Sequence, residues 1–255
     1  MNHSCMIISF LDSGPDGRLR DAPLEGQPVP SLIGDLTITD IVELTVTVGV
    51  GSTVATNLIR IGLYGDKCPE LVKEMIDLCG RGIVTSQDLL LGAPVRLGQG
   101  FGSLTFIRPE ERLEFGIQSQ KVAYAKSIRK AKAPDEFVPQ PRPSGDRLDS
   151  VKNEQSARLH NVAGLVSVPA YGIGYGGGGL LGKNDEAYSS AFQITASPVR
   201  DMDKEGRKVI GQLIDDNSMN VIARLAGSPT RKMLPGQNGG PPLIKVTVDD
   251  CAKVK

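Results

Sequence analysis

The sequence predicts a mostly β fold, an antiparallel barrel or sandwich that carries two helices. Short segments rich in β-branched residues recur along the 255-residue chain, with turns that contain glycine or proline between them. Two further segments repeat apolar residues at helical spacing. Strands and helices do not alternate regularly, so a doubly wound parallel sheet is not expected.

The predicted strands begin with a hairpin. Residues 40–48 alternate aliphatic side chains with threonines, which is the pattern of a strand with one buried face. A glycine-rich turn at residues 49–52 separates this strand from a second one at 57–64, and the two are expected to pair antiparallel. Further strands are expected at residues 162–168, 191–196, 208–214 and 243–248, with short strands and loops at 81–118.

The clearest helix is predicted at residues 70–79. Pro69 suits the first helical turn, where its missing N–H costs no hydrogen bond, and Glu70 complements the helix dipole there. Gly80 is a natural stop. Residues 218–225 predict a shorter helix. The apolar residues of the first helix form one stripe, which consists of Leu71, Val72, Met75, Leu78 and Cys79.

Composition excludes several functional classes. With 29 basic and 29 acidic residues the chain has no formal net charge, which argues against nucleic-acid binding. Two histidines cannot supply a multi-histidine metal site, and no serine lies in the strand-turn-helix context of a nucleophile that His160 would activate. The four cysteines form no CxxC pair, and their spacing allows at most one or two disulfides. We expect Cys79 and Cys251 to be buried free thiols.

A glycine-rich segment argues against both a transmembrane helix and a nucleotide-binding site. Residues 159–182 are uncharged and long enough to span a membrane, but eight of the twenty residues at 163–182 are glycine and Pro169 interrupts the run. We therefore expect a strand and a loop here, and no transmembrane segment. Residues 172–177 fit G-x-G-x-x-G, but the glycines that follow cannot begin a stable helix. No nucleotide or other cofactor is expected.

Two regions have the character of additions to a compact domain. Residues 1–38 show little periodicity and predict an irregular extension. Residues 117–132 have a helical composition, and residues 133–145 contain four prolines, which is typical of a loop or semi-rigid spacer. A solvated helix surface explains the basic residues of this region, and docking to an acidic partner is the functional alternative. These basic residues are Lys121, Lys126, Arg129, Lys130 and Lys132.

Several segments resemble, in the same order, the motifs of cyclophilins. Residues 61–79 (IGLYGDKCPELVKEMIDLC) resemble the cyclophilin stretch I-G-L-F-G-D-x-x-P-K-T-V-E-N-F-R-x-L-C. Residues 164–168 resemble G-L-L-S-M, residues 190–195 resemble S-Q-F-F-I-T, and residues 208–213 resemble V-V-F-G-K-V. Residues 218–222 resemble G-M-D-V-V, and residues 244–251 resemble the closing V-x-I-x-D-C-G strand.

The resemblance implies a fold and an activity. The cyclophilin fold is an eight-stranded antiparallel β-barrel capped by two α-helices, which would occupy residues 39–255 with a basic and proline-rich insertion at about 117–160. Cyclophilins catalyse cis/trans isomerisation of X–Pro bonds, whose barrier is ~18–20 kcal/mol. In that family an apolar pocket grips the proline ring, and an arginine donates hydrogen bonds that favour the pyramidal prolyl nitrogen.

Two alignments place the family's F-H-R-I-I-P-G-F-M-x-Q motif on this chain. One alignment keeps Phe106 and Arg108, and makes Arg108 the candidate catalytic residue. The other needs no gap and puts Phe106 at the position of the arginine. It assigns Glu111, Arg112 and Glu114 to the positions of the pocket Phe, Met and Gln.

The remaining implied pocket positions fall later in the chain. Ala191 stands for the pocket glutamine, Phe192 matches the first phenylalanine, and Gln193 replaces the second. The position nearest the family's tryptophan is Met202, and Arg207 stands for the pocket histidine, while His160 lies far from that position in the sequence. Because the family's pocket is built from aromatic rings and this chain has no tryptophan, the resemblance implies weak or no isomerase activity.

The expected function is that of a structural or interaction subunit of a larger assembly, whose partners are proteins or X–Pro segments. The alternative is an active, divergent prolyl isomerase that assists protein folding through Arg108. A third possibility is a module that holds proline-containing peptides without turning them over. The sequence gives no compartment: divergent cyclophilins are frequent in plastids, and the cytoplasm is the other expectation.

Overall fold

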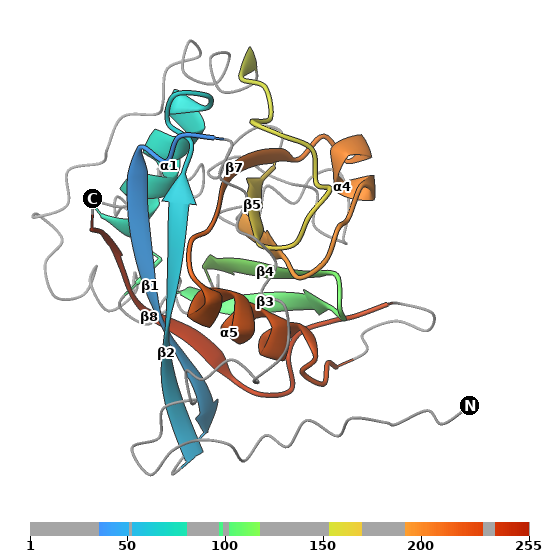
Figure 1. Cartoon of the computed structure of the whole chain (residues 1–255). Helices are drawn as coiled ribbons and strands as arrows, with labels where there is room; N and C mark the ends of the chain where they lie inside the picture. The colour runs from blue at the N-terminus through green and yellow to red at the C-terminus, as the bar shows by residue number, and fades with distance from the viewer. Residues whose placement is uncertain are drawn as a thin grey trace, which may run out of the picture.

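Eight strands close into one antiparallel barrel in the computed structural model of the chain (Figure 1). The structure describes residues 36–50, 53–80, 97–98, 102–117, 153–169, 192–231 and 238–254. Around the barrel the strands follow the order β1-β2-β7-β5-β6-β4-β3-β8. The strands are β1 (Asp40–Val50), β2 (Thr53–Leu63), β3 (Gly102–Arg108), β4 (Arg112–Ile117), β5 (Leu165–Val168), β6 (Phe192–Thr195), β7 (Lys208–Leu213) and β8 (Val246–Lys253). The predicted antiparallel β-barrel is confirmed.

The β1–β2 hairpin is the longest element of the barrel. Its strands pair along their whole length, from Asp40 opposite Leu63 to Val50 opposite Thr53. The other edge of β1 pairs with β8, which closes the barrel. Alternate residues of β1 face inward and are fully buried, as the alternating pattern predicts. The barrel interior is therefore lined by aliphatic side chains from strands that are far apart in the sequence.

Helix α1 (Pro69–Cys79) ends where the sequence predicts and begins one residue before the predicted 70–79. Pro69 occupies the first turn, and the N–H of Gly80 donates to the carbonyl of Ile76. The side chain of Cys68 does not cap the helix. A distant carboxylate takes this role, because Glu154 accepts hydrogen bonds from the N–H groups of the first turn, at 2.7 Å from Glu70 and 3.0 Å from Leu71.

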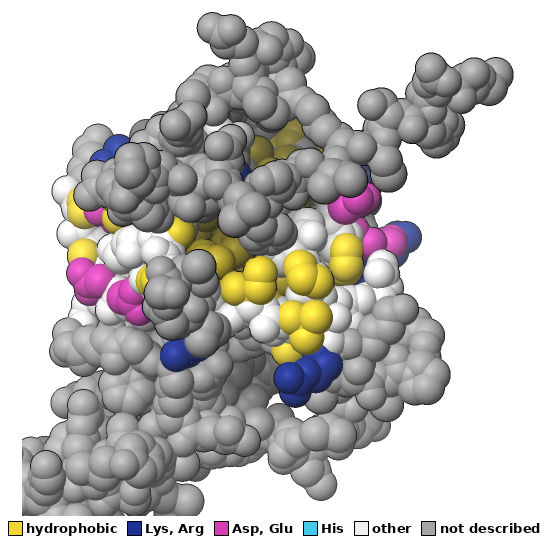
Figure 2. Space-filling view, turned by 90° about the horizontal axis from the view of Figure 1, so that it is seen from below, with side chains coloured by type: hydrophobic (Ala, Val, Ile, Leu, Met, Phe, Trp, Pro, Cys, Tyr) yellow, Lys and Arg dark blue, Asp and Glu magenta, His cyan; other side chains and the backbone are white. Residues whose placement is uncertain are grey.

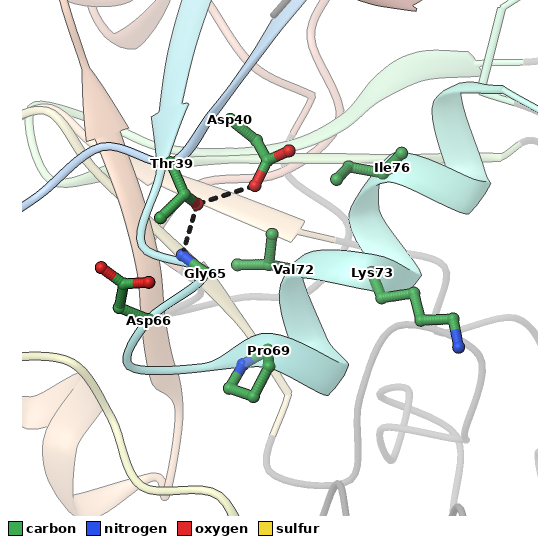
Figure 3. Close-up of a pocket in the computed structure, with 8 residues that line it drawn as sticks. All are labelled: Thr39, Asp40, Gly65, Asp66, Pro69, Val72, Lys73 and Ile76. Carbon is green, nitrogen blue, oxygen red and sulfur yellow. Dashed lines mark hydrogen bonds between the residues drawn. The ribbon is translucent and has the colours of Figure 1, made fainter.

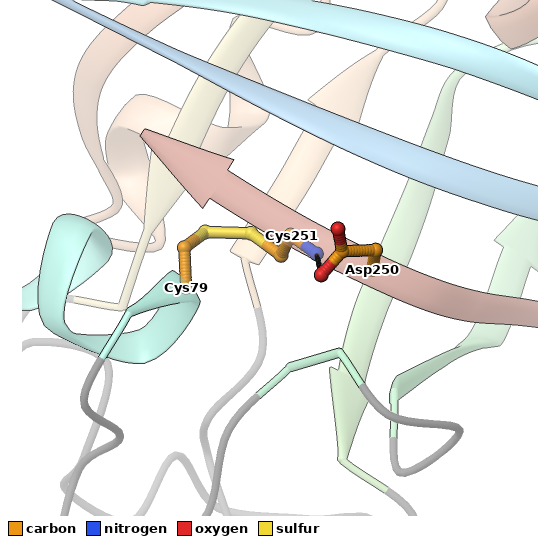
Figure 4. Close-up of a disulfide and its surroundings, with 3 residues drawn as sticks. All are labelled: Cys79, Asp250 and Cys251. Carbon is orange, nitrogen blue, oxygen red and sulfur yellow. Dashed lines mark hydrogen bonds between the residues drawn. A yellow bond between two sulfur atoms is a disulfide. The ribbon is translucent and has the colours of Figure 1, made fainter. Parts of the chain in front are cut away.

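A disulfide joins Cys79, the last residue of α1, to Cys251 in β8 (Figure 4). The two Cα atoms are 4.7 Å apart although 172 residues separate them in the sequence. The expectation of free thiols at these positions is therefore wrong, because spacing along the chain does not show which cysteines the closed barrel brings together. Cys68 is a buried free thiol, and burial raises its pKa to about 11.

Two further helices follow the barrel strands. Helix α5 (Asp216–Ala226) begins two residues before the predicted 218–225, because the carboxylate of Asp215 accepts a hydrogen bond from the N–H of Ser218 at 2.7 Å and caps the first turn. Helix α4 (Asp201–Lys204) was not predicted. The two helices longer than a single turn in the described residues, α1 and α5, are the two expected from the sequence.

The last strand departs from its prediction at residues 243–248. Strand β8 begins at Val246 and continues to Lys253. A register shift against β1 leaves Asp249 as an extra residue, so that two consecutive acidic side chains lie on the exposed face while Cys251 returns to the interior. In the sequence, Asp249 and Asp250 interrupt the alternation of apolar and polar residues, so the predicted strand ends too early, at residue 248.

Several predictions lie outside the described residues. These are the predictions for the extension up to residue 35, for the helix at 117–132 except Ile117, which ends β4, for the proline-rich loop at 133–145, and for the G-x-G-x-x-G segment at 172–177. Among the helices that the structure describes, none is long and apolar enough to cross a membrane.

Candidate functional site

The segment that resembles the family's arginine motif forms the β3–β4 hairpin. Arg108 lies opposite Arg112, and Phe106 lies opposite Glu114. Opposed residues of an antiparallel pair extend from the same face of the sheet. Because Ile107, between Phe106 and Arg108, is fully buried in the core, these four side chains lie on the outer face of the barrel. We call this face, formed by β3, β4 and β6, the outer wall.

Arg108 lies at the end of the hairpin, beside the turn. Its Nη1 atom is 3.4 Å from Oε2 of Glu111, and both side chains are about one third exposed, at 35% and 37%. The turn between them contains Glu110 with a left-handed φ of 60°. Phe192 packs on the inner side of the barrel, where its ring is fully buried and stacks on Phe115 with centroids 5.4 Å apart. Arg108 and Phe192 therefore lie on opposite faces.

Strand β6 adds a polar side chain to the outer wall. Gln193 lies opposite Glu114, and its Nε2 atom donates a hydrogen bond to Oε2 of Glu114 at 2.9 Å. The other amide atom, Oε1 of Gln193, is buried and finds no hydrogen-bond partner among the described residues. Where the family resemblance places a second pocket phenylalanine, this chain carries a buried amide.

Two arginines share one carboxylate beside these residues. Arg112 makes a bidentate ion pair with Glu205, with Nη1 to Oε2 at 3.0 Å and Nη2 to Oε1 at 3.1 Å. Nε of Arg207 lies 3.5 Å from the same Oε2 atom. Burial lowers the pKa of Arg207 from its ordinary value, and the charges of Glu114 and Glu205 oppose that shift. The charges of Arg207 and Glu114 therefore interact, although Glu114 lies in β4 and Arg207 lies just before the start of β7.

His160 is the site residue that the sequence does not reveal. Its ring is fully buried, and Nδ1 lies 2.6 Å from Oδ1 of Asp203, which also accepts a hydrogen bond from the His160 N–H at 3.2 Å. Burial lowers the pKa of His160, against the attraction of Asp203 and together with the repulsion of Arg207 and Arg112. His160 therefore lies near Arg207 in space, although 47 positions, from 160 to 207, separate them in the chain.

The structure brings together only part of the predicted site. Arg112, Glu114, Gln193 and Arg207 form one connected polar group on the outer wall, with Phe106 and Arg108 on the same face. Phe192 and Met202 are fully buried and present no surface to a ligand. Glu111 lies at the turn and contacts Arg108, and Ala191 lies outside the described residues. The group also includes Asp203, Glu205 and His160. Only the folded structure identifies these three as members of the site.

This arrangement is suited to recognition of polar groups. Guanidinium and carboxylate groups are held in fixed geometry, and they can exchange charge-assisted hydrogen bonds with a polar partner. In the part of the chain that the structure describes, no three His, Cys, Asp or Glu side chains are placed to hold a metal ion.

A hollow of about 300 Å³ lies elsewhere, between the first turns of α1 and the adjoining ends of β1 and β2 (Figure 3). Asp40 lines it, and the hydrogen bond from Lys253 Nζ at 2.5 Å lowers the pKa of this carboxyl group. Thr39 Oγ1 donates to Asp40 and accepts from the Gly65 N–H at 2.9 Å, as the dashed lines of Figure 3 show. The hollow is separate from the outer wall.

A known protein family matches most of the chain. No curated protein matches the chain significantly. Residues 48–253, which include the outer wall, match the family described as cyclophilin type peptidyl-prolyl cis-trans isomerase/CLD. The chain therefore belongs to the cyclophilin-type peptidyl-prolyl cis-trans isomerase family.

Proposed function

We propose that this chain is a structural or interaction subunit of a larger assembly, with weak or no prolyl isomerase activity. The observation that carries the proposal is the ion-pair group of Arg112, Glu205 and Arg207 on the outer wall. By resemblance, two of these positions belong to the methionine and histidine of the proline pocket. Charged groups therefore occupy the place where the family grips an apolar ring.

Seating a proline ring on this group is unfavourable. The ring offers no hydrogen bond, so it would remove water from the guanidinium and carboxylate groups without replacing the lost interactions. The side chain of Arg112 is already only 12% exposed, and that of Arg207 18% exposed, so each depends on Glu205 as a partner. An apolar pocket would have to form by breaking these pairs.

The catalytic donor is also displaced. The isomerase reaction needs a donor aimed at the prolyl nitrogen while the amide rotates. Phe106, and not an arginine, lies across from Glu114, the residue at the position of the family's pocket glutamine in the ungapped alignment. Arg108 lies further along, at the turn, and its guanidinium is engaged by Glu111.

The alternative, an active divergent isomerase that assists folding, is favoured by one observation. Arg108 is partly exposed and lies on the same face as Phe106, which preserves the first and third residues of the F-x-R motif. An arginine with its guanidinium near solvent is able to leave Glu111, because exposed ion pairs contribute only about 0–1 kcal/mol.

Prolyl exchange measured by NMR on an Ala-Pro tetrapeptide separates the two functions. We expect the full chain to leave the exchange rate at its value in buffer. Acceleration by the wild-type chain that is lost in Arg108→Ala would establish the alternative. As a matched gain-of-function control, Arg112→Met with Glu114→Gln returns two pocket residue types of the family, and we expect it to bind the peptide more tightly than the wild type does.

The subunit role is tested on the native protein. In size-exclusion chromatography of a gently lysed native source, we expect the chain to elute at a mass well above that of two copies. We further propose that residues 1–38 and the insertion at about 117–160 carry the contacts, because additions to a domain are where new interactions arise. Deletion of residues 1–38 should then release the chain, and elution as a free monomer before deletion would contradict the role.

A further inference from the structure

In the part of the chain that the structure describes, no strand pairs with the outer edge of β2 in the half nearest the hairpin turn. β2 pairs with β1 along its whole length but with β7 only at Ile61–Leu63. Next to this short ladder, the start of α5 replaces a neighbouring strand, since the N–H of Arg60 donates to Oγ of Ser218 at 2.8 Å. The amide of Asn217 reaches the carbonyl of Leu58 at 3.5 Å. The hairpin continues beyond this point and projects from the barrel (Figure 1).

The exposed backbone groups of this edge belong to alternate residues. In an antiparallel strand the N–H and C=O of one residue point to the same side, and the side alternates along the chain. Because Arg60 and Leu58 direct these groups away from β1, Thr56 and Val54 do so as well. No hydrogen bond from a described residue reaches the backbone of Thr56 or Val54 along this edge.

The edge lacks the features that keep strands apart. Residues 53–59 contain no charge and no proline, although charged side chains and proline are the usual protection of an open edge. Val54 is 42% exposed and Leu58 is 38% exposed, with exposed Thr56 between them. Seen from below, hydrophobic side chains gather on the described part of the face, with Lys or Arg side chains directly beside them (Figure 2).

We propose that a second copy of this chain pairs with this edge, antiparallel and about a two-fold axis through Thr56. In this register Thr56 faces Thr56 of the second copy, and Val54 faces Leu58 of the second copy on each side of the axis. The edge is therefore self-complementary, as a symmetric dimer requires. Apolar pairs and threonine pairs across strands are both favourable. The backbone groups that face outward become a continuous ladder between the two hairpins.

Charge and size fit a weak dimer. Arg60, the nearest charged residue of β2, is held by Glu43 at 2.8 Å and would lie opposite the hairpin turn of the second copy, so no like charges meet. Val54 and Thr56 of each copy contribute directly to the ladder, and Leu58 joins it when its carbonyl exchanges the 3.5 Å contact with Asn217 for the N–H of Val54 of the second copy. Such an interface lies at the low end of specific interfaces, below about 1,200 Å². Association is therefore concentration-dependent and independent of the outer wall.

Sedimentation equilibrium of the full chain tests the proposal. From about 1 µM to about 1 mM, we expect the mass to rise from one chain to two, as a weak dimer requires. Thr56→Lys places two lysines face to face across the axis and should raise the dissociation constant by roughly tenfold or more. Ala223→Lys adds the same charge on an exposed position of α5 and should change nothing. A wild-type chain that stays monomeric throughout overturns the proposal.

A charge exchange tests the register itself. In the double variant Val54→Lys with Leu58→Glu, each introduced lysine faces an introduced glutamate of the second copy, so the dimer should persist and weaken with added salt. If this double variant dissociates as readily as Thr56→Lys, or if Thr56→Lys dimerises like the wild type, the two-fold arrangement is wrong. Thermal unfolding of each variant confirms that the exposed substitutions leave the barrel folded.

Discussion

The inner and outer faces of strand β4 differ in kind. Leu113 and Phe115 point inward and are fully buried among the aliphatic and aromatic side chains of the barrel. Arg112 and Glu114 alternate with them and point outward, into ion pairs and hydrogen bonds with residues of other elements. One strand thus contributes to two separate tasks. The fold depends on the inner face, so the outer face can change its chemistry while the barrel stays intact.

The largest expected difference in unfolding free energy is between variants of two neighbouring residues of β4, one on its inner face and one on its outer face. Phe115→Ala should lower the free energy of unfolding by about 3–5 kcal/mol, because it leaves a cavity beside Phe192. Glu114→Ala removes a part-buried hydrogen bond and leaves the buried Nε2 of Gln193 without this acceptor, which should cost less, about 1–3 kcal/mol. Urea unfolding curves of both variants measure the difference. Equal costs would mean that the outer wall also supports the fold.

The second contrast concerns the disulfide between α1 and β8. Cys251→Ser should lower the free energy of unfolding by about 2–5 kcal/mol, since the bond closes a loop between residues 79 and 251. Reductant should destabilise the wild-type chain by a similar amount and leave the variant unchanged. A wild-type chain whose unfolding is indifferent to reductant would show that the pair is not bonded in solution.

The sequence predicts the inner face far better than the outer one. Alternating aliphatic residues predict the strands, and Pro69 with Gly80 predicts the limits of α1, because these signals arise from neighbours along the chain. The partners of the outer wall come from separate loops: Glu205 follows α4, and His160 precedes β5. Such contacts depend on barrel closure, and no local pattern encodes them. The disulfide between Cys79 and Cys251 was not predicted for the same reason, because only barrel closure brings the two cysteines together.

A smaller effect concerns pH and the buried His160. Burial lowers its pKa below the ordinary value of 6.5, so the unfolded chain binds a proton first as the pH falls. Stability from this group is therefore complete above about pH 6.5 and is lost below it, by at most about 1.4 kcal/mol per pH unit. Asp203 reduces the shift, and Arg207 and Arg112 increase it.

Unfolding measured in urea at two values, about pH 7.5 and about pH 5.5, checks this effect. The stability difference between the two conditions should be larger for the wild type than for His160→Gln, which cannot titrate. The same difference in both chains would mean that the His160 pKa is not lowered. Because the two chains differ only at residue 160, the comparison isolates the contribution of this side chain.

An NMR titration with a proline peptide shows whether the outer wall holds a proline ring. Amide signals of ¹⁵N-labelled full chain are followed while an Ala-Pro peptide is added to about 1 mM, a level at which binding worth about 4 kcal/mol is visible. We expect no saturable shifts at Phe106, Arg112, Glu114 and Gln193. Saturable shifts at these residues, together with faster exchange between the cis and trans peptide signals, would contradict this expectation.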